Sequence, residues 1–322
     1  MWTGRGRLEI RDTADSEVCA TASHASAYIV KAPGNKIVVI GAGGRLGAAL
    51  IREYAQDFNV VGFTHSQLDL GSATQLHSAL DPLDFELIIN TAAQTNVDRC
   101  ETHPDEAFAI NAEAPRVLAS ICREKNARFI HVSTDYVFDG RKRTPYTEQD
   151  RAEPISVYGE SKREGERRVL EANDRSLVLR VSWVFGPDRP SFVDWAIKQA
   201  RQHEEVKAIA DKWATPTYTL DLAQLLKPLL VDRDVTGLLQ LANGGECSWQ
   251  EYAQWAIDCC RAEGIPLKTE KIEAAALRDM KSFIAQRPIY SVLSSEKYFD
   301  LTGQRPRDWR DAVAAYVQDY VK

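Results

Sequence analysis

The sequence predicts a doubly wound α/β fold, in which helices cover both faces of a parallel sheet. From Lys36 onward, short β-branched and apolar runs alternate with longer helical patterns, an alternation typical of parallel sheets. The runs are apolar almost throughout, so we expect strands that are buried on both faces. A glycine-rich turn also follows the first run. After about Gly186 the pattern is less regular, which predicts a smaller second lobe.

Three parts of the chain are expected from this pattern. Residues 1–35 are expected to be a poorly ordered extension, 36–185 a sheet domain, and 186–322 mainly a substrate lobe, with 238–242 returning to the sheet. The predicted strands are 36–40, 59–63, 86–90, 128–133, 176–181 and 238–241. The predicted helices are 46–56, 104–125, 161–172, 192–203, 249–263 and 309–321.

Composition excludes several classes of protein. The 322 residues are 44% apolar and carry a net charge of -6, which favours an enzyme with a large core over a protein that binds nucleic acid or an anionic membrane. No apolar run approaches the roughly 18 residues needed to span a bilayer, and no secretory signal is visible. We therefore expect a cytoplasmic protein whose six cysteines are free thiols.

The glycine turn indicates a dinucleotide site. Gly41, Gly44 and Gly47 follow the first strand and open a helix. Such glycines allow the backbone to approach a pyrophosphate at the helix N-terminus, where unpaired N–H groups favour anions. The spacing is G-x-x-G-x-x-G, which is typical of short-chain dehydrogenases. We expect a nicotinamide cofactor here.

The end of the second predicted strand bears on which cofactor is used. An NAD site offers a carboxylate about 20 residues after the glycines, but this strand ends Phe63-Thr-His-Ser66. NADPH is therefore our first expectation and NADH the alternative. Further on, Asp69 and Leu70 are candidates for contact with the adenine. The third strand ends in small residues that would lie beside the ribose and nicotinamide, with Ala92, Ala93 and Thr95 as the candidates.

Tyr158 and Lys162 form the candidate catalytic pair. Their spacing places a phenol and an ammonium on one face of a helix. The ammonium is expected to lower the pKa of the phenol, so that Tyr158 can protonate a carbonyl oxygen, while Lys162 also holds the nicotinamide ribose. Thr134 ends a predicted strand upstream, where its hydroxyl would bind the same oxygen. The histidines at 65, 77, 103, 131 and 203 lack metal-ligand spacing and are interpreted as surface or strand residues; we expect no metal.

The chain resembles the dTDP-4-dehydrorhamnose reductases, which belong to the extended short-chain dehydrogenases and have a Rossmann-type fold. The resemblance runs from Lys36 almost to the C-terminus. The segments that carry it are 41–47, 90–98, 133–140, 157–162, 179–184, 211–217, 243–249 and 287–293. The long N-terminal segment departs from the family, and so does the absence of an acid at His65.

The resemblance implies a reaction and a set of site residues. The reaction is reduction of the 4-keto group of dTDP-4-dehydro-L-rhamnose to dTDP-L-rhamnose. The implied catalytic set is Thr134, Tyr158 and Lys162. The implied cofactor residues are Gly41, Gly44, Arg45, Leu46, Gly47, His65, Asp69, Leu70, Ala92, Ala93, Thr95, Tyr158 and Lys162. The implied substrate residues are Thr95, Val97, Thr134, Trp183 and Arg287, with Trp183 packing on the sugar and Arg287 meeting the diphosphate.

Two alternatives stay open at the level of sequence. One is another nucleotide-sugar reductase or epimerase of the same superfamily; a dehydratase is less favoured, because Thr134-Asp135 is followed by Tyr136 rather than a second carboxylate. The other is a non-catalytic, NADP-binding regulatory subunit like that of methionine adenosyltransferase. Neither reading requires a nucleic acid or a membrane, and a homodimer is a further hypothesis.

Overall fold

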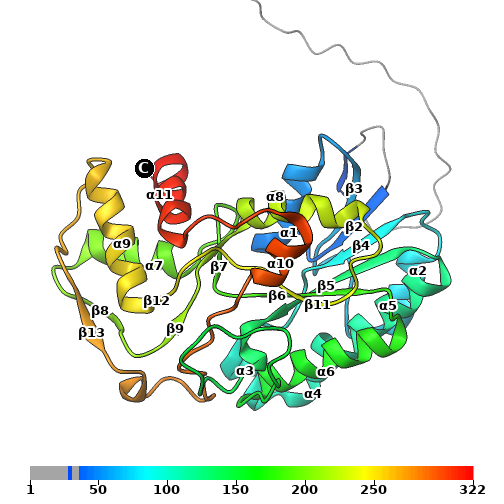
Figure 1. Cartoon of the computed structure of the whole chain (residues 1–322), viewed down its shortest axis with the longest axis horizontal. Coiled ribbons are helices and arrows are strands. Elements are labelled where there is room, and N and C mark those ends of the chain that lie inside the picture. The colour runs from blue at the N-terminus through cyan, green and yellow to red at the C-terminus, as the bar shows by residue number, and fades with distance from the viewer. Residues whose placement is uncertain (1–27, 31–35, 322) are drawn as a thin grey trace, which may run out of the picture.

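A parallel sheet forms the centre of the molecule (Figure 1). The computed structural model describes residues 28–30 and 36–321. The central sheet has seven strands in the order β1-β3-β2-β4-β5-β6-β11. Their bounds are β1 Tyr28–Val30, β2 Lys36–Ile40, β3 Asn59–Phe63, β4 Leu87–Asn90, β5 Arg128–Thr134, β6 Leu177–Val181 and β11 Gly237–Gln240. All six predicted strands are therefore present.

The strand order sets the position of the ligand crevice. Strands β3, β2, β4, β5, β6 and β11 pair in parallel, whereas β1 joins β3 antiparallel at the edge. The chain passes from β2 to β3 on one side and then crosses from β3 to β4 on the other side of β2. Ligands of such sheets bind beyond the carboxyl ends of the strands at this reversal. The strand at Tyr28–Val30 differs from the expectation of a poorly ordered extension; residues 1–27 and 31–35 lie outside the described residues.

Two apolar layers cover the sheet because alternate side chains of each strand point to opposite faces. Ile37 and Val39 pack in one cluster with α1 (Arg45–Tyr54), α8 (Thr219–Val231) and α10 (Glu296–Thr302). Val38 and Ile40 pack in the other with α2 (Ala73–Leu80), α5 (Ala114–Glu124) and α6 (Val157–Ala172). The doubly wound prediction is confirmed, and the helices lie on both sides of the sheet in Figure 1.

The C-terminal lobe lies at one end of the sheet, on the left of Figure 1. Helices α7 (Phe192–Gln202), α9 (Trp249–Ala262) and α11 (Trp309–Tyr320) pack around an aromatic cluster. Three small strand pairs complete the lobe: β7 (Val184–Phe185) with β10 (Thr217–Tyr218), β9 (Trp213–Ala214) with β12 (Cys247–Ser248), and β8 (Val206–Ile209) with β13 (Ile272–Ala275).

The structure differs from the predicted helices in three ways. Helix α6 begins at Val157, earlier than expected, because Ser156 Oγ accepts from Gly159 N and caps it. The predicted helix 104–125 contains α4 (Pro104–Phe108), a π-helical turn at Ala109–Glu113, and α5. Four helices were not predicted: α2, α3 (Val97–Thr102), α8 and α10; short 3-10 turns lie at Asp135–Val137 and Leu277–Asp279.

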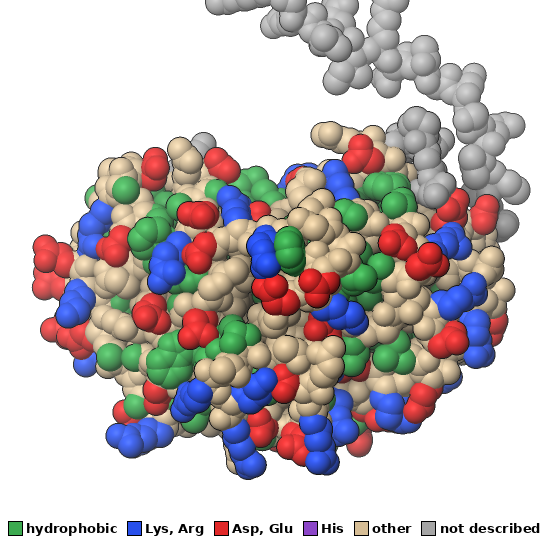
Figure 2. All heavy atoms as spheres, in the orientation of Figure 1, with side chains coloured by type: hydrophobic (Ala, Val, Ile, Leu, Met, Phe, Trp, Pro, Cys, Tyr) green, Lys and Arg blue, Asp and Glu red, His purple; other side chains and the backbone are tan. Residues whose placement is uncertain are grey.

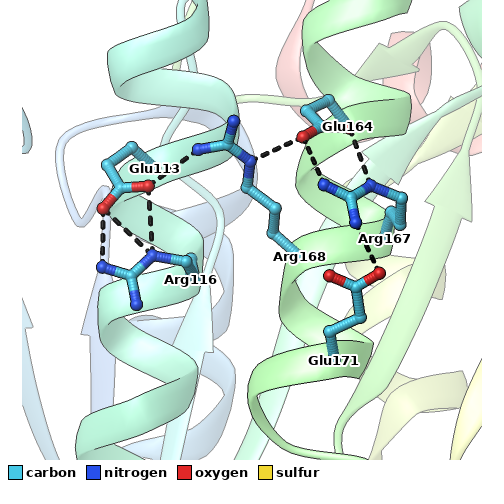
Figure 3. Close-up of polar contacts among 6 residues, drawn as sticks. All are labelled: Glu113, Arg116, Glu164, Arg167, Arg168 and Glu171. Atoms are coloured by element: carbon cyan, nitrogen blue, oxygen red, sulfur yellow. Dashed lines mark hydrogen bonds and ion pairs between the residues drawn. The ribbon is translucent and has the colours of Figure 1, made fainter.

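The outer surface carries charges of both signs, which are interspersed on the face drawn in Figure 2. Arg168 of α6 connects the end of the π-helical turn to α6, because it contacts Glu113 and Glu164. The network comprises Glu113, Arg116, Glu164, Arg167, Arg168 and Glu171 (Figure 3). Across residues 28–30 and 36–321, no helix is long and apolar enough to cross a membrane. The five cysteines in this part of the chain are free and buried.

Candidate active site

The glycine turn between β2 and α1 is shaped by close contacts that exclude larger residues. Gly41 has φ +90°, and a Cβ there would lie 2.7 Å from Thr91 Oγ1. A Cβ on Gly47 would collide with the carbonyl oxygen of Gly41. The turn therefore packs tightly against the end of β4 and brings the N-terminus of α1 to the crevice. Because the first N–H groups of a helix lack partners within it, this cradle fits the pyrophosphate of a dinucleotide.

Two implied cofactor residues direct their side chains elsewhere. Arg45 donates to the carbonyl oxygens of Val184 and Arg189, each at 3.0 Å, and to that of Pro190. Leu46 is buried in the core beneath α1. The expectation that Arg45 and Leu46 line the cofactor therefore stays a prediction, in which a contact from either residue would come from its backbone. The arginine instead attaches the loop after β7 to α1.

The remaining implied cofactor residues surround the same edge of the sheet. His65 is exposed just after β3. Asp69 accepts from Gly71 N at 2.9 Å in the turn before α2, and Leu70 is buried among the residues of that face, so an adenine contact from Leu70 would use little of its side chain. Ala92 and Ala93 are half-buried after β4, whereas Thr95 is exposed.

Thr134 and Tyr158 meet at the carboxyl end of β5. The phenol of Tyr158 is buried, and the Thr134 side chain beside it lowers the phenol's pKa in part, against the larger effect of burial. Val97 packs beside it, and the Tyr136 ring meets the Tyr158 ring edge-on at 5.5 Å. A Cβ on Gly159 would collide with the carbonyl oxygen of Tyr136, so this glycine lets the start of α6 approach the turn after β5.

Lys162, one helical turn after Tyr158, belongs to a row of buried polar side chains. Its Nζ donates to the carbonyl oxygen of Val132 at 2.7 Å and lies 3.3 Å from His131 Nε2. His131 Nδ1 in turn lies 3.1 Å from Asn90 Nδ2. Burial lowers the pKa of Lys162 to about 8 and lowers that of His131 as well. His131 and Asn90 were missed as site residues; the signal available was two polar side chains in otherwise apolar strands.

The expected effect of Lys162 on Tyr158 is not what the structure gives. Burial is the largest influence on the Tyr158 phenol and raises its pKa above the usual range. The reason is geometric, because the ammonium points toward Val132 and His131. Tyr158 is therefore held in its protonated form, which suits a proton donor.

A second buried pair lies beside this site. Asp135 accepts from Ser291 Oγ at 2.5 Å and from Thr134 Oγ1 at 3.1 Å, and burial raises its pKa. Lys212 donates to the carbonyl oxygen of Pro288 at 2.9 Å, and burial lowers its pKa to about 8. The carboxylate of Asp135 raises the pKa of Lys212 in part. Sequence reasoning missed this pair, whose members are far apart along the chain.

Lys212 connects Trp183 to the ring pair of Tyr136 and Tyr158. Lys212 Nζ is 5.4 Å from the Trp183 ring centroid and 5.1 Å from that of Tyr136, so the lysine links the two aromatic walls. Trp183 also packs beside Trp249 and Tyr252. Its φ of +37° is uncommon for a bulky residue, and this conformation turns the chain between β6 and β7. A contact with sugar stays a prediction.

Arg287 has a partner within the protein. Its Nη2 lies 2.8 Å from Asp98 Oδ2, and its guanidinium stacks 3.6 Å from the Phe283 ring centroid. Asp98 also accepts from the backbone of Ile284 and Ala285. The carboxylate thus attaches segment 283–287 to α3, and its hydrogen bond with Arg287 lowers its own pKa. A diphosphate contact from Arg287 stays a prediction and would share the guanidinium with Asp98.

Comparison with known proteins identifies the family to which this fold and site belong. Residues 35–322 match the family model described as the RmlD substrate binding domain. The chain belongs to this family. A dTDP-4-dehydrorhamnose reductase from Aggregatibacter actinomycetemcomitans is 32% identical over 88% of this chain and 99% of its own length. The spore coat polysaccharide biosynthesis protein SpsK of Bacillus subtilis is 33% identical over 88% of this chain and 97% of its own.

Solved structures of dTDP-4-dehydrorhamnose reductases superpose closely on this chain. The dTDP-4-dehydrorhamnose reductase of Bacillus anthracis, determined in complex with NADP, has a TM-score of 0.82 at 28% identity and covers 89% of this chain and 99% of its own. That of Clostridium acetobutylicum has a TM-score of 0.81 at 32% identity, with 88% and 98% covered. The family assignment made from sequence is confirmed.

Proposed function

We propose that this protein is a cytoplasmic NAD(P)H-dependent reductase that converts dTDP-4-dehydro-L-rhamnose to dTDP-L-rhamnose. The observation that carries the proposal is the meeting of Thr134 and a protonated, buried Tyr158 at the ligand crevice, with Lys162 one turn further along α6. Family relatives that carry the name dTDP-4-dehydrorhamnose reductase support the same reaction.

The roles of the chain's own residues follow from their positions. Tyr158 donates its phenolic proton to the 4-keto oxygen, and Thr134 hydrogen-bonds that oxygen and orients it. Lys162, held by Val132 and His131, stabilises the phenolate that remains. The glycine turn and the N-terminus of α1 would hold the cofactor, which supplies a hydride when bound. Trp183 and Lys212 would line the crevice opposite Tyr158 and position the sugar.

The direct test is oxidation of NADPH, and separately of NADH, in the presence of enzymatically generated dTDP-4-dehydro-L-rhamnose. We expect loss of reduced cofactor to be matched by formation of dTDP-L-rhamnose, identified by chromatography and mass. Cofactor binding without turnover of this sugar would contradict the proposed substrate. A panel of other dTDP-4-keto-6-deoxysugars, assayed in parallel, then separates a different sugar from the absence of catalysis.

The name of one relative supports an alternative nucleotide-sugar substrate. A relative from Streptomyces antibioticus, 36% identical over 88% of this chain and 94% of its own length, carries the name probable dTDP-4,6-dihydroxy-2-methyloxan-3-one 4-ketoreductase. The same Tyr158 chemistry would serve either 4-keto sugar. Turnover of that sugar in preference to dTDP-4-dehydro-L-rhamnose would favour this alternative.

The pH dependence of turnover is expected to follow the titration of the Lys162 ammonium. Burial lowers its pKa to about 8, whereas burial raises the pKa of Tyr158. A lysine is charged below its pKa, so the ammonium is present at pH 7 and is lost as pH rises through about 8. We expect kcat to fall along this alkaline limb while the phenol stays protonated. The measurement is kcat from pH 6.5 to 9.5, a range that extends about 1.5 pH units on either side of the Lys162 pKa.

A matched variant identifies the group responsible. Lys162→Arg places a guanidinium, which stays charged across this range, near the same partners. We expect its alkaline limb to disappear even where its overall rate is lower. A wild-type kcat that is flat to pH 9.5, or an unchanged limb in Lys162→Arg, would contradict the assignment.

A further inference from the structure

An exposed arginine lies where the loop after β7 meets the glycine turn and the end of β3. Arg189 Nε donates to the carbonyl oxygen of Gly43 at 2.8 Å. A Cβ built on Gly43 would lie 3.7 Å from Arg189 Nη2 and 3.5 Å from Thr64 Cγ2. The guanidinium of Arg189 is therefore next to both the glycine turn and the first residue after β3.

The charges around Arg189 leave it available for an anion. Within residues 28–30 and 36–321, Arg189 makes no ion pair, and its Nε–Gly43 bond is the one side-chain hydrogen bond it donates. The neighbouring carboxylate, Asp188, is held by Arg52 at 2.5 Å. The segment after β3, Thr64 to Ser66, contains no acid. At this place a carboxylate selects the ribose hydroxyls of NAD, whereas a nearby arginine accommodates the 2′-phosphate of NADP.

Contacts within the protein hold the loop that carries Arg189. Arg45 donates to the carbonyl oxygens of Val184, Arg189 and Pro190, and Arg52 pairs with Asp188. Both arginines belong to α1, so one side chain of the glycine-turn helix holds the backbone of this loop and another holds the Asp188 carboxylate. A group that is already positioned loses less entropy on binding.

We propose that Arg189 binds the 2′-phosphate of NADPH and gives the protein its preference for NADPH over NADH. The hydroxyls of Thr64 and Ser66, which lie 3.0 Å apart, supply further polar contacts at the same place. The inference rests on the proposed nicotinamide cofactor but not on the identity of the sugar.

The test compares two ligands that differ in the 2′-phosphate. Isothermal titration calorimetry measures binding of 2′,5′-ADP and of 5′-AMP to the full chain, with no sugar present. In Arg189→Ala, we expect the affinity for 2′,5′-ADP to fall about tenfold or more while that for 5′-AMP is unchanged, since only the charge-assisted contact with phosphate is lost. Arg189→Lys should keep part of the affinity. Arg151→Ala, which removes a remote surface charge paired with Glu153, is the matched control.

Each outcome decides the proposal. Loss confined to 2′,5′-ADP supports it, together with a raised KM for NADPH and an unchanged KM for NADH. Equal loss for both ligands would show that Arg189 only supports the Gly43 turn and would overturn the proposal, as would unchanged binding or an equal effect of Arg151→Ala. Because the titrations need no turnover, failure of the proposed sugar reaction would leave their result intact.

Discussion

Tyr158→Phe is expected to lower kcat about 100-fold or more, with binding of NADP⁺ largely kept. The substitution removes the proton donor, while the ring still packs against Tyr136 and Val97. Turnover is measured under saturating cofactor and sugar, and NADP⁺ affinity by titration. The loss should appear in kcat and not in the KM for cofactor, because the phenol acts on the carbonyl oxygen of the sugar.

Tyr136→Phe is the matched control for this prediction. It removes a phenol from the same edge-on pair of buried rings, so it tests whether any change of polarity at this place stops turnover. We expect a much smaller effect. The proposed mechanism would be wrong if Tyr158→Phe retained near-normal turnover, or if both variants lost activity to the same extent.

Glu166→Ala is expected to give the largest loss of stability. Glu166 accepts from Arg180 at 2.8 and 2.6 Å and from Ser133 at 2.6 Å. The side chains of Arg180 and Glu166 are 2% and 5% exposed, so the variant leaves a buried guanidinium without its counter-charge. Removing one partner of such a pair costs about 3–5 kcal/mol, which denaturant unfolding followed by circular dichroism would measure.

Glu164→Ala provides the comparison on the same helix. Glu164 pairs with Arg167 and Arg168 on the partly exposed outer side of α6 (Figure 3). Ion pairs of this kind contribute little to stability, because water screens them, and we expect a small change in the unfolding midpoint. Similar destabilisation by both substitutions would refute the view that burial of the Glu166–Arg180 pair sets its importance.

Local pattern was enough to predict the sheet but not all the helices. Each predicted strand is a short apolar run that is buried on both faces, so propensity and tertiary structure agree there. Helix α8 was not predicted because Pro228 and the threonines near its start are typical of loops. In the structure, Leu222, Leu226 and Leu229 form an apolar stripe that packs against the sheet. Helix α10 is short, and its one fully buried side chain, Tyr298, gives little periodic signal.

Some residues of the candidate site could be predicted from local sequence and others could not. Thr134, Tyr158 and Lys162 lie on two elements whose motifs are contiguous in sequence, so their meeting could be predicted. Asp135 and Ser291 are paired across 156 positions of the chain, and no local pattern encodes such a contact. The outward course of the Arg45 side chain depends on the loop after β7, whose path is determined by tertiary packing.

The way the chain returns to the sheet bears on how this protein can be divided. The C-terminal half supplies β11 beside β6, and α8 and α10 over one face of the sheet. A fragment ending near residue 185 would expose the edge of β6 together with the apolar face that α8 covers, and such edges invite aggregation. The two lobes are thus interdependent parts of one folding unit. Exchange of the C-terminal half between relatives would succeed only if the strand and both helices moved with it.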